Sequence, residues 1–158
     1  MTVANIGTNS IVTLREITEE TVVAICKLSD TLSEQHQKMV APNAISIAQA
    51  HYNQHAWFRA IYADETPVGF IMLYDNPEEP EYFLWRLMIA GPYQGIGYGS
   101  KAVQSLIEYV RQRLGASELL VSCVEGEGSP EGFYAKLGFK RNGEILGEEV
   151  VMSLAIED

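Results

Sequence analysis

A loop with four glycines joins the most apolar segment of this chain to its best amphipathic helical pattern. The stretch runs from Met88 to Ser100 and reads Met-Ile-Ala-Gly-Pro-Tyr-Gln-Gly-Ile-Gly-Tyr-Gly-Ser. Because glycine has no Cβ, a ligand can approach the amide hydrogens of such a loop, and positive φ angles are permitted. The first turn of the following helix offers amides without a helical partner and the positive end of the helix dipole. The stretch therefore predicts a phosphate-binding site.

The loop differs from the two common phosphate motifs. Its spacing is Gln94-x-x-Gly97-x-Gly99 followed by Ser100. A Walker loop ends in Gly-Lys-Ser/Thr, and a dinucleotide fingerprint reads Gly-x-Gly-x-x-Gly. Glycine also serves simply to make turns, so the loop alone leaves a purely structural role open.

The histidines and cysteines do not form a metal-binding pattern. His51 and His55 are four residues apart and would share one helix face. No acidic third ligand lies near them in the sequence, so we expect no metal and two histidines that face solvent or line a substrate site. Cys26 and Cys123 lie among apolar residues, which indicates reduced, buried thiols.

Length and composition indicate one soluble domain. The chain has 158 residues, 47% of them hydrophobic, which is enough for one core of ordinary size. No apolar run approaches the roughly 20 residues of a membrane helix, and Arg86 interrupts the longest one. The N-terminus lacks the basic and apolar regions of a secretory signal, so we expect no membrane association and a cytoplasmic location.

The formal net charge of −10 argues against a nucleic-acid-binding protein, because phosphate backbones attract clustered Lys and Arg. An acidic surface suits a cationic small partner. Acidity also serves solubility alone, so the charge by itself does not identify a substrate.

The first half of the chain predicts a strand, several helices and a hairpin. Residues 1–10 show little hydrophobic pattern and are expected to form a loose arm. The other expected elements are a strand at 11–15, a helix with Thr18 as N-cap, mixed helical residues at 32–41, a helix at 44–52, and an antiparallel hairpin of 57–63 with 67–73.

The second half is organised around a continuous apolar segment. Residues 81–89 are almost all apolar, which is typical of a central strand covered on both faces. After the glycine loop, apolar residues recur at helical spacing over 97–114. The remaining expected elements are a strand at 118–124, a short helix at 131–137, an edge segment from 139 and a last strand at 150–156.

Two motifs on these elements give the chain a specific resemblance. The apolar strand, the loop from Gln94 to Ser100, the amphipathic helix and then Phe133-Tyr134-Ala135-Lys136-Leu137-Gly138-Phe139 resemble the GNAT superfamily of acetyl-CoA-dependent N-acetyltransferases. Stretches at 82–90, 94–100, 128–134 and 147–152 are similar to the bacterial spermine/spermidine acetyltransferase group. The resemblance implies a single α/β domain over residues 1–158, with a mixed, mostly antiparallel sheet flanked by helices.

The resemblance also implies acetyl-CoA as co-substrate, bound along the central strand and the loop. The pantetheine arm would pair with the strand backbone as an added strand does. The diphosphate would lie on the loop amides, where Gln94 offers hydrogen bonds but no charge. The residues expected to bind this ligand are Leu87, Met88, Ile89, Gln94, Gly95, Ile96, Gly97, Tyr98, Gly99, Ser100, Ser129 and Lys136.

The implied chemistry is direct attack of an amine on the thioester, with Tyr134 as general acid. An amine whose pKa is near ~10.4, as in lysine, must lose a proton before it attacks. A phenol with a pKa of about 10 stays protonated at neutral pH and can donate to a departing thiolate of pKa roughly 8.5. A ring that merely packs beneath the ligand is the alternative role for Tyr134.

The expected acceptor is a small-molecule primary amine, most specifically a polyamine such as spermidine or spermine. Glu81 is a candidate to accept the amine proton, or plain surface charge, and Tyr82 and Trp85 either line the acceptor pocket or belong to the core. Trp85 and Arg86 occupy the middle of a strand on which related polyamine enzymes can carry acidic residues. Acetylation of a peptide or protein amine is the alternative activity, and a non-catalytic acyl-CoA sensor is the alternative class. The resemblance further implies a homodimer paired through the final strand, taken as a sheet edge.

Overall fold

Seven strands form one sheet in the computed structural model, which describes residues 5–157. The strands are β1 (Val12–Arg15), β2 (Ala56–Ala63), β3 (Thr66–Asn76), β4 (Glu81–Ile89), β5 (Glu118–Val124), β6 (Lys140–Leu146) and β7 (Glu149–Ala155). Their order across the sheet is β1-β2-β3-β4-β5-β7-β6. Neighbours are antiparallel except β4 and β5, which are parallel. The prediction of a mixed, mostly antiparallel sheet is confirmed.

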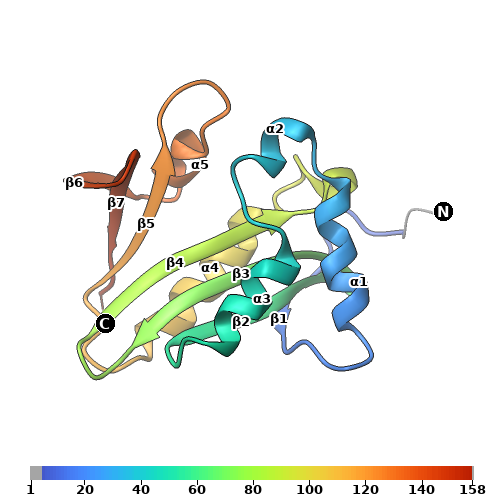
Figure 1. Cartoon of the computed structure of the whole chain (residues 1–158), viewed down its shortest axis with the longest axis horizontal. Helices are drawn as coiled ribbons and strands as arrows, with labels where there is room; N and C mark the ends of the chain where they lie inside the picture. Colours follow the sequence, from blue (N-terminus) through green and yellow to red (C-terminus); the bar gives the residue numbers. More distant parts are fainter. Residues whose placement is uncertain (1–4, 158) are drawn as a thin grey trace.

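Helices cover both faces of this sheet. They are α1 (Val22–Lys27), α2 (Glu34–Gln37), α3 (Asn43–His51), α4 (Tyr98–Arg111) and α5 (Glu131–Lys136), with the 3-10 turns η1 (Leu28–Thr31) and η2 (Gly91–Tyr93). Figure 1 shows α1, α2 and α3 in front of the sheet and α4 behind it. Helix α4 supplies the crossover that the parallel pair β4 and β5 requires. No helix within residues 5–157 is long and apolar enough to cross a membrane.

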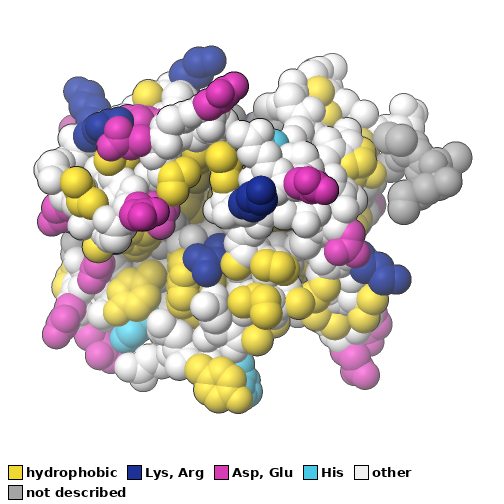
Figure 2. Space-filling model, turned by 45° about the horizontal axis from the view of Figure 1, so that its top comes forward, with side chains coloured by type: hydrophobic (Ala, Val, Ile, Leu, Met, Phe, Trp, Pro, Cys, Tyr) yellow, Lys and Arg dark blue, Asp and Glu magenta, His cyan; other side chains and the backbone are white. Residues whose placement is uncertain are grey.

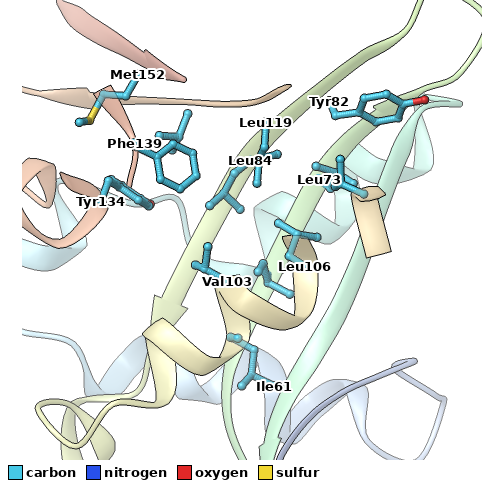
Figure 3. Close-up of a cluster of buried hydrophobic side chains, with 14 of the residues drawn as sticks. Ile61, Leu73, Tyr82, Leu84, Val103, Leu106, Leu119, Tyr134, Phe139 and Met152 are labelled. Carbon is cyan, nitrogen blue, oxygen red and sulfur yellow. The ribbon is translucent and has the colours of Figure 1, made fainter. Parts of the chain in front are cut away.

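The larger core lies between the sheet and α4. The inward stripe of α4 consists of Ala102, Val103, Leu106 and Val110, all completely buried. Figure 3 shows Val103 and Leu106 among the strand side chains of this core. The apolar stripe predicted from the sequence therefore anchors the helix whose N-terminus carries the glycine loop.

A second, smaller core lies on the opposite face, beneath α1 and α3. Its buried members are Ile25, Leu32, Ala60, Phe70, Met72 and Met88. Met88 of β4 belongs to this core, whereas Leu84 of the same strand belongs to the core beneath α4. Strand β4 is thus covered on both faces, as its continuous apolar run predicts.

The N-terminal arm differs from the prediction where the structure describes it. Tyr98 Oη donates a hydrogen bond of 2.9 Å to the Gly7 carbonyl, and Lys101 Nζ donates one of 2.7 Å to the Thr8 carbonyl. Ser10 is buried. Residues 7–10 are therefore held against α4 rather than loose, while residues 1–4 of the predicted arm lie outside the described residues.

The first helix begins later than its predicted N-cap. The Thr18 amide donates a hydrogen bond of 2.8 Å to Thr21 Oγ1, and residues 18–21 form a turn. Helix α1 starts only after Thr21. The Thr21 hydroxyl thus satisfies an amide that precedes the helix, while the Val22 amide still donates a helical bond of 2.9 Å to the Thr18 carbonyl.

The edge of the sheet also differs from the prediction. Strand β7 lies between β5 and β6, so the final strand is not an edge strand, and the prediction of pairing through it is wrong. Val150, Val151 and Met152 of β7 are buried, whereas every residue of β6 is exposed. An apolar strand is stabilised in the interior of a sheet, and a polar strand is tolerated at its edge.

Candidate active site

Strand β4 has a free edge over its second half. Its pairing with β5 is limited to residues 83–84 of β4 and 120–121 of β5. Among the described strands none pairs with this side of β4 beyond residue 84, because β5 turns away and continues its ladder with β7. Figure 1 shows β4 and β5 diverging. The backbone groups of residues 85–89 on this edge can hydrogen-bond an extended ligand as an added strand would.

A bulge interrupts β4 where the free edge begins. Leu84 pairs with Leu73 and Arg86 pairs with Met72, so Trp85 is the extra residue. Directly paired residues lie on the same face of a sheet. Arg86 therefore faces the α1–α3 side with Met72, whereas Leu84 faces α4. In a regular strand these two side chains would share a face, so the bulge redirects Arg86.

The glycine loop follows η2 and leads into α4. Gly95 and Gly97 have φ angles of 81° and 94°, a region that residues with a Cβ rarely adopt. A Cβ at either position would meet nothing within 4 Å, so the backbone here is open to a ligand. The amides of residues 95–100 donate no hydrogen bond to any residue in the described part of the chain. Unpaired amides at the start of a 14-residue helix suit an anionic group.

A cavity of about 1170 Å³ joins the free edge to the loop. Its lining includes residues 83–89 of β4, residues 121–124 of β5, Gln94, Gly99, Phe133, Tyr134, residues 36–42 around α2, and Glu149. Figure 2 shows this face of the molecule hollowed between two lobes, with hydrophobic side chains inside and charges of both signs at the rim. The cavity can hold an extended ligand with an anionic end.

Tyr134 lies on the wall of this cavity and is only 6% exposed. Its ring packs edge-to-face on Phe133 and Phe139, with centroids 5.2 and 5.5 Å away. The described residues offer its hydroxyl no hydrogen-bond partner. Burial, with a smaller effect of the nearby Cys123, raises the pKa of Tyr134. The phenol therefore keeps its proton at neutral pH and can donate it to a group in the cavity.

The model of the acetyltransferase (GNAT) family matches residues 20–139. The chain belongs to this family. It is 28% identical over 95 residues to an L-2,4-diaminobutyric acid acetyltransferase from Streptomyces avermitilis, a match that covers 60% of this chain and 52% of the relative. It is 26% identical over 102 residues to a 5-NmdU N-acetyltransferase from Pseudomonas phage PaMx11, with 65% and 69% covered. The chain thus spans about half the length of the first relative.

Solved GNAT structures share the fold over nearly the whole chain. The PaiA N-acetyltransferase from Thermoplasma acidophilum, in complex with coenzyme A, superimposes with a TM-score of 0.65 at 18% identity, covering 92% of this chain and 99% of its own. GNAT enzymes use acetyl-CoA as acetyl donor. The free edge of β4, the unpaired loop amides and the cavity between them fit this ligand in this member of the GNAT family.

Two loop residues that were expected to bind the coenzyme make other contacts with their side chains. Gln94 Nε2 donates a hydrogen bond of 2.8 Å to the Ile89 carbonyl, which ties the loop to the end of β4. This bond uses one N–H that was expected to meet a phosphate. The Tyr98 ring is buried and its hydroxyl is bound to Gly7, so only the backbone amide of Tyr98 remains available to a ligand.

Ser129 and Lys136 lie beside the cavity lining rather than on it. Ser129 Oγ accepts a hydrogen bond of 3.1 Å from the Glu131 amide and so stabilises the start of α5. Lys136 is exposed at the end of the same helix. Contact of either residue with the coenzyme stays a prediction.

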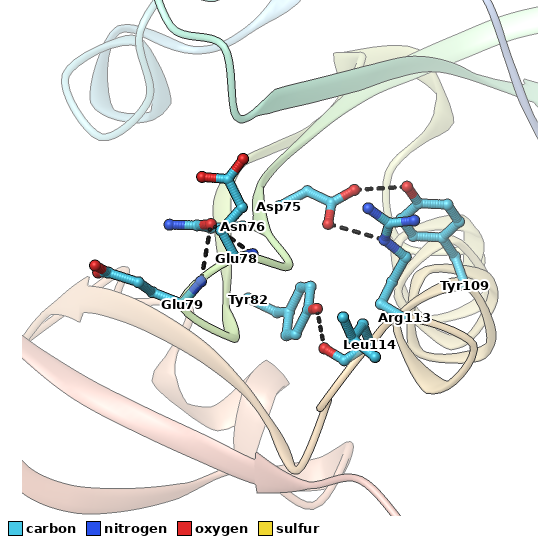
Figure 4. Close-up of polar contacts among 8 residues, drawn as sticks. All are labelled: Asp75, Asn76, Glu78, Glu79, Tyr82, Tyr109, Arg113 and Leu114. Carbon is cyan, nitrogen blue, oxygen red and sulfur yellow. Dashed lines mark hydrogen bonds and ion pairs between the residues drawn. The ribbon is translucent and has the colours of Figure 1, made fainter.

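Tyr82 is a core residue, so of the two roles predicted for it the core is confirmed and the acceptor pocket is wrong. Its side chain is 2% exposed and belongs to the core beneath α4 (Figure 3). Its hydroxyl donates a hydrogen bond to the Leu114 carbonyl, as Figure 4 shows, and burial raises its pKa. The ring lies on the α4 face of β4, as Leu84 does, whereas Glu81 and Trp85 do line the cavity.

Arg86 and Glu149 line the cavity and were not assigned a role from the sequence. The sequence gives a weak indication of a functional role for Arg86, since it is the one basic residue within an otherwise apolar strand. The sequence gives no such indication for Glu149, because only the pairing of β7 with β5 brings it to this site.

The histidines expected to face solvent or substrate do not line the cavity. The His51 ring lies edge-on to Tyr52, and the His55 ring lies edge-on to Tyr74. Within residues 5–157, no three His, Cys, Asp or Glu side chains are grouped so that they could hold a metal ion.

Proposed function

We propose that this GNAT enzyme transfers the acetyl group of acetyl-CoA to the primary amine of a small molecule, with Tyr134 as general acid. The observation that carries the proposal is the continuous path from the free edge of β4 to the unpaired amides at the start of α4. Tyr134 opens onto the same cavity with an unbonded hydroxyl. Binding and proton donation thus meet in one site.

The backbone positions the donor. Leu87, Met88 and Ile89 would hydrogen-bond the pantetheine arm along the free edge, and the amides of residues 95–100 would hold the diphosphate. The side chains of this part of the site contribute less to binding, because the strand edge and the loop present main-chain groups to the ligand. Acetyl-CoA supplies an activated acetyl thioester when it is bound.

The side chains move the protons. An acceptor amine with a pKa near ~10.4 must be deprotonated before it attacks, and the two carboxylates on the cavity lining, Glu81 and Glu149, are placed to attract or take up that proton. Tyr134 holds a proton for the leaving sulfur. Its raised pKa makes it a weaker acid than free tyrosine, so the transfer is driven by the negative charge that develops on the thiolate beside it.

The polyamine acceptor predicted from the sequence is the finer form of this proposal. The cavity lining carries Glu81 and Glu149 but also Lys38 and Arg86, so it lacks the excess of negative charge that would attract a polycation. One relative is named for 2,4-diaminobutyric acid, an amine that carries a carboxylate. The acceptors to be assayed should therefore include both polyamines and amines that carry a carboxylate.

The test is release of free CoA by the purified chain with spermidine, spermine, simple diamines, diamino acids, a lysine peptide and a peptide with a free N-terminus. We expect release with at least one small amine and less with the peptides. Acetyl-CoA binding by calorimetry without release for any amine would instead establish the non-catalytic sensor. Preference for a peptide would establish the alternative activity.

Homodimer formation and a cytoplasmic location stay predictions. The exposed edge strand available for pairing is β6, where Ile145 and Leu146 are exposed apolar residues. Light scattering coupled to size-exclusion chromatography would determine the mass of the particle in solution.

A further inference from the structure

Arg86 stands apart from the other arginines of the chain. The chain has six, and five of them form ion pairs, namely Arg15, Arg59, Arg111, Arg113 and Arg141. Arg86 pairs with no carboxylate among residues 5–157. Its Nη1 and Nη2 donate hydrogen bonds of 3.1 Å to neutral oxygens, the Trp85 carbonyl and Gln49 Oε1. Its Nε is buried without a partner.

This bonding leaves a partly buried cation without an anion. Burial lowers the pKa of Arg86, yet a guanidinium remains charged at neutral pH in proteins. An unpaired charge in such a place is costly, and an anion that pairs with it offsets the cost. The planar fork of a guanidinium matches a carboxylate especially well. Arg86 faces the cavity, so the anion can come from a ligand.

The position of Arg86 along β4 assigns that anion to the acceptor rather than to coenzyme A. The diphosphate site begins beyond Ile89, at the loop amides of residues 95–100. Three strand residues separate Arg86 from the end of β4, roughly 10 Å at the usual rise per residue. Arg86 thus lies at the other end of the free edge from the phosphates.

Glu149 provides a negative charge in the same cavity. It accepts a hydrogen bond of 3.3 Å from Ser122 Oγ, and its charge opposes the lowering of the Arg86 pKa. The two groups interact through the cavity but form no ion pair. One cation and one carboxylate separated in this way complement a ligand that carries both charges.

We propose that the acceptor is an amine that also bears a carboxylate, and that Arg86 binds this carboxylate. The inference rests on the proposed acetyltransferase function and narrows its acceptor to amino acids. A polyamine has no group that would pair with Arg86. A dianionic phosphate would leave one charge uncompensated beside Glu149, so a carboxylate fits better.

The first test compares matched substrates with the unmodified chain. L-2,4-diaminobutyrate and 1,3-diaminopropane differ only in the carboxylate, as do L-lysine and 1,5-diaminopentane. We expect kcat/KM to be about 10- to 100-fold higher for the amino acid of each pair, the range of one hydrogen-bonded charge pair. Lysinamide, which has a neutral amide in place of the carboxylate, should behave like the diamine.

The second test removes the cation. Arg86→Met should reduce the preference for the amino acid to near 1 by lowering its kcat/KM about 10- to 100-fold, while the value for the diamine stays within about threefold. Arg86→Lys should keep part of the preference, because the charge remains and the fork is lost. Arg111→Met, a surface arginine paired with Glu108, is the matched control and should leave the preference unchanged.

The outcomes separate this inference from the proposed function. If CoA is released with diamines as fast as with amino acids, the acetyltransferase stands and the carboxylate site is refuted, even if neither Arg86 variant folds. If Arg86→Met binds acetyl-CoA normally by calorimetry and keeps the amino-acid preference, the site is likewise refuted. Release with no amine at all refutes the proposed function itself.

Discussion

The two ends of the cavity are built from different parts of the polypeptide. The end that we propose for the coenzyme consists of main-chain groups, namely the free edge of β4 and the amides of residues 95–100. The end that we propose for the acceptor consists of side chains from separate elements, with Arg86 on β4 and Glu149 on β7. Main-chain groups are the same in every sequence that forms the strand and the loop. Side chains can change one at a time, so specificity for the acceptor can change without loss of the donor site.

Tyr134 lines the same cavity as the two ends, and its removal should have the largest effect. Tyr134→Phe should lower kcat about 100-fold or more, because the leaving thiolate loses its proton donor, and should leave the Kd for acetyl-CoA unchanged. Steady-state assays and calorimetry measure the two quantities. Tyr52→Phe is the control, since Tyr52 is 88% exposed at the end of α3. Unchanged turnover would remove Tyr134 from the chemistry and leave it a packing role.

A substitution in the glycine loop should affect only the coenzyme end. Gly97→Ala forces a residue with a Cβ to φ near 94°, which costs about 1–2 kcal/mol and displaces the amides that hold the diphosphate. We expect the KM for acetyl-CoA to rise about 10-fold with little change in the preference among acceptors. Gly143→Ala is a matched control, because Gly143 of β6 has φ 91° and equally open surroundings. A similar rise in KM for the control would show that the effect is general strain.

The hydrogen bonds that join the end of β3 to the end of α4 should be separable from both ends of the cavity. Figure 4 shows Tyr109 donating a hydrogen bond of 2.6 Å to Asp75, which also accepts one of 2.9 Å from Arg113. Asp75 is 8% exposed, so Tyr109→Phe should lower the free energy of unfolding by about 1.5–3 kcal/mol. Urea unfolding measures this change. Altered KM values for either substrate in the folded variant would contradict the separation.

The smallest expected effect is a loss of stability at alkaline pH, where Tyr109 loses its proton. Burial and the hydrogen bond to Asp75 raise the pKa of Tyr109 from 10.0 to about 12. The folded state therefore binds this proton more tightly than the unfolded chain, so the stabilisation is complete below about pH 10 and is lost as the pH rises toward 12. The urea midpoint should fall between pH 9 and pH 11.5 by more in the unmodified chain than in Tyr109→Phe. Equal pH dependence would show that Tyr109 does not titrate in this range.

Most of the coenzyme end was predictable from local sequence. The continuous apolar run of residues 81–89 predicts a buried strand, and the glycines after it predict a loop. The helical spacing of the apolar residues in α4 predicts an amphipathic helix. Local periodicity left the role of Tyr82 open and assigned no role to Arg86. The bulge at Trp85 reverses the alternation of side chains along β4, and the sequence around it contains no residue that marks a bulge.

Local sequence also could not predict which strands lie next to one another in the sheet. Residues 150–156 read as a last strand, and a last strand is easily taken for an edge, but β6 covers it. The pairing of β7 with β5, on its other side, brings Glu149 next to Ser122 and into the cavity. A turn sequence such as Gly147-Glu148-Glu149 contains no sign of this contact.

The sequence by itself determined most of the helices and strands of this GNAT family member and the glycine loop with its open amides, because glycine, hydrophobic period and helix start act over a few neighbouring residues. The tertiary structure decided which side chains face the acceptor, because that depends on one bulge in β4 and on the order of β5, β7 and β6 across the sheet. Those features arise from contacts between residues far apart in the chain. The bulge changes the face on which the side chains after it lie, and the strand order decides which strands contribute side chains to the cavity.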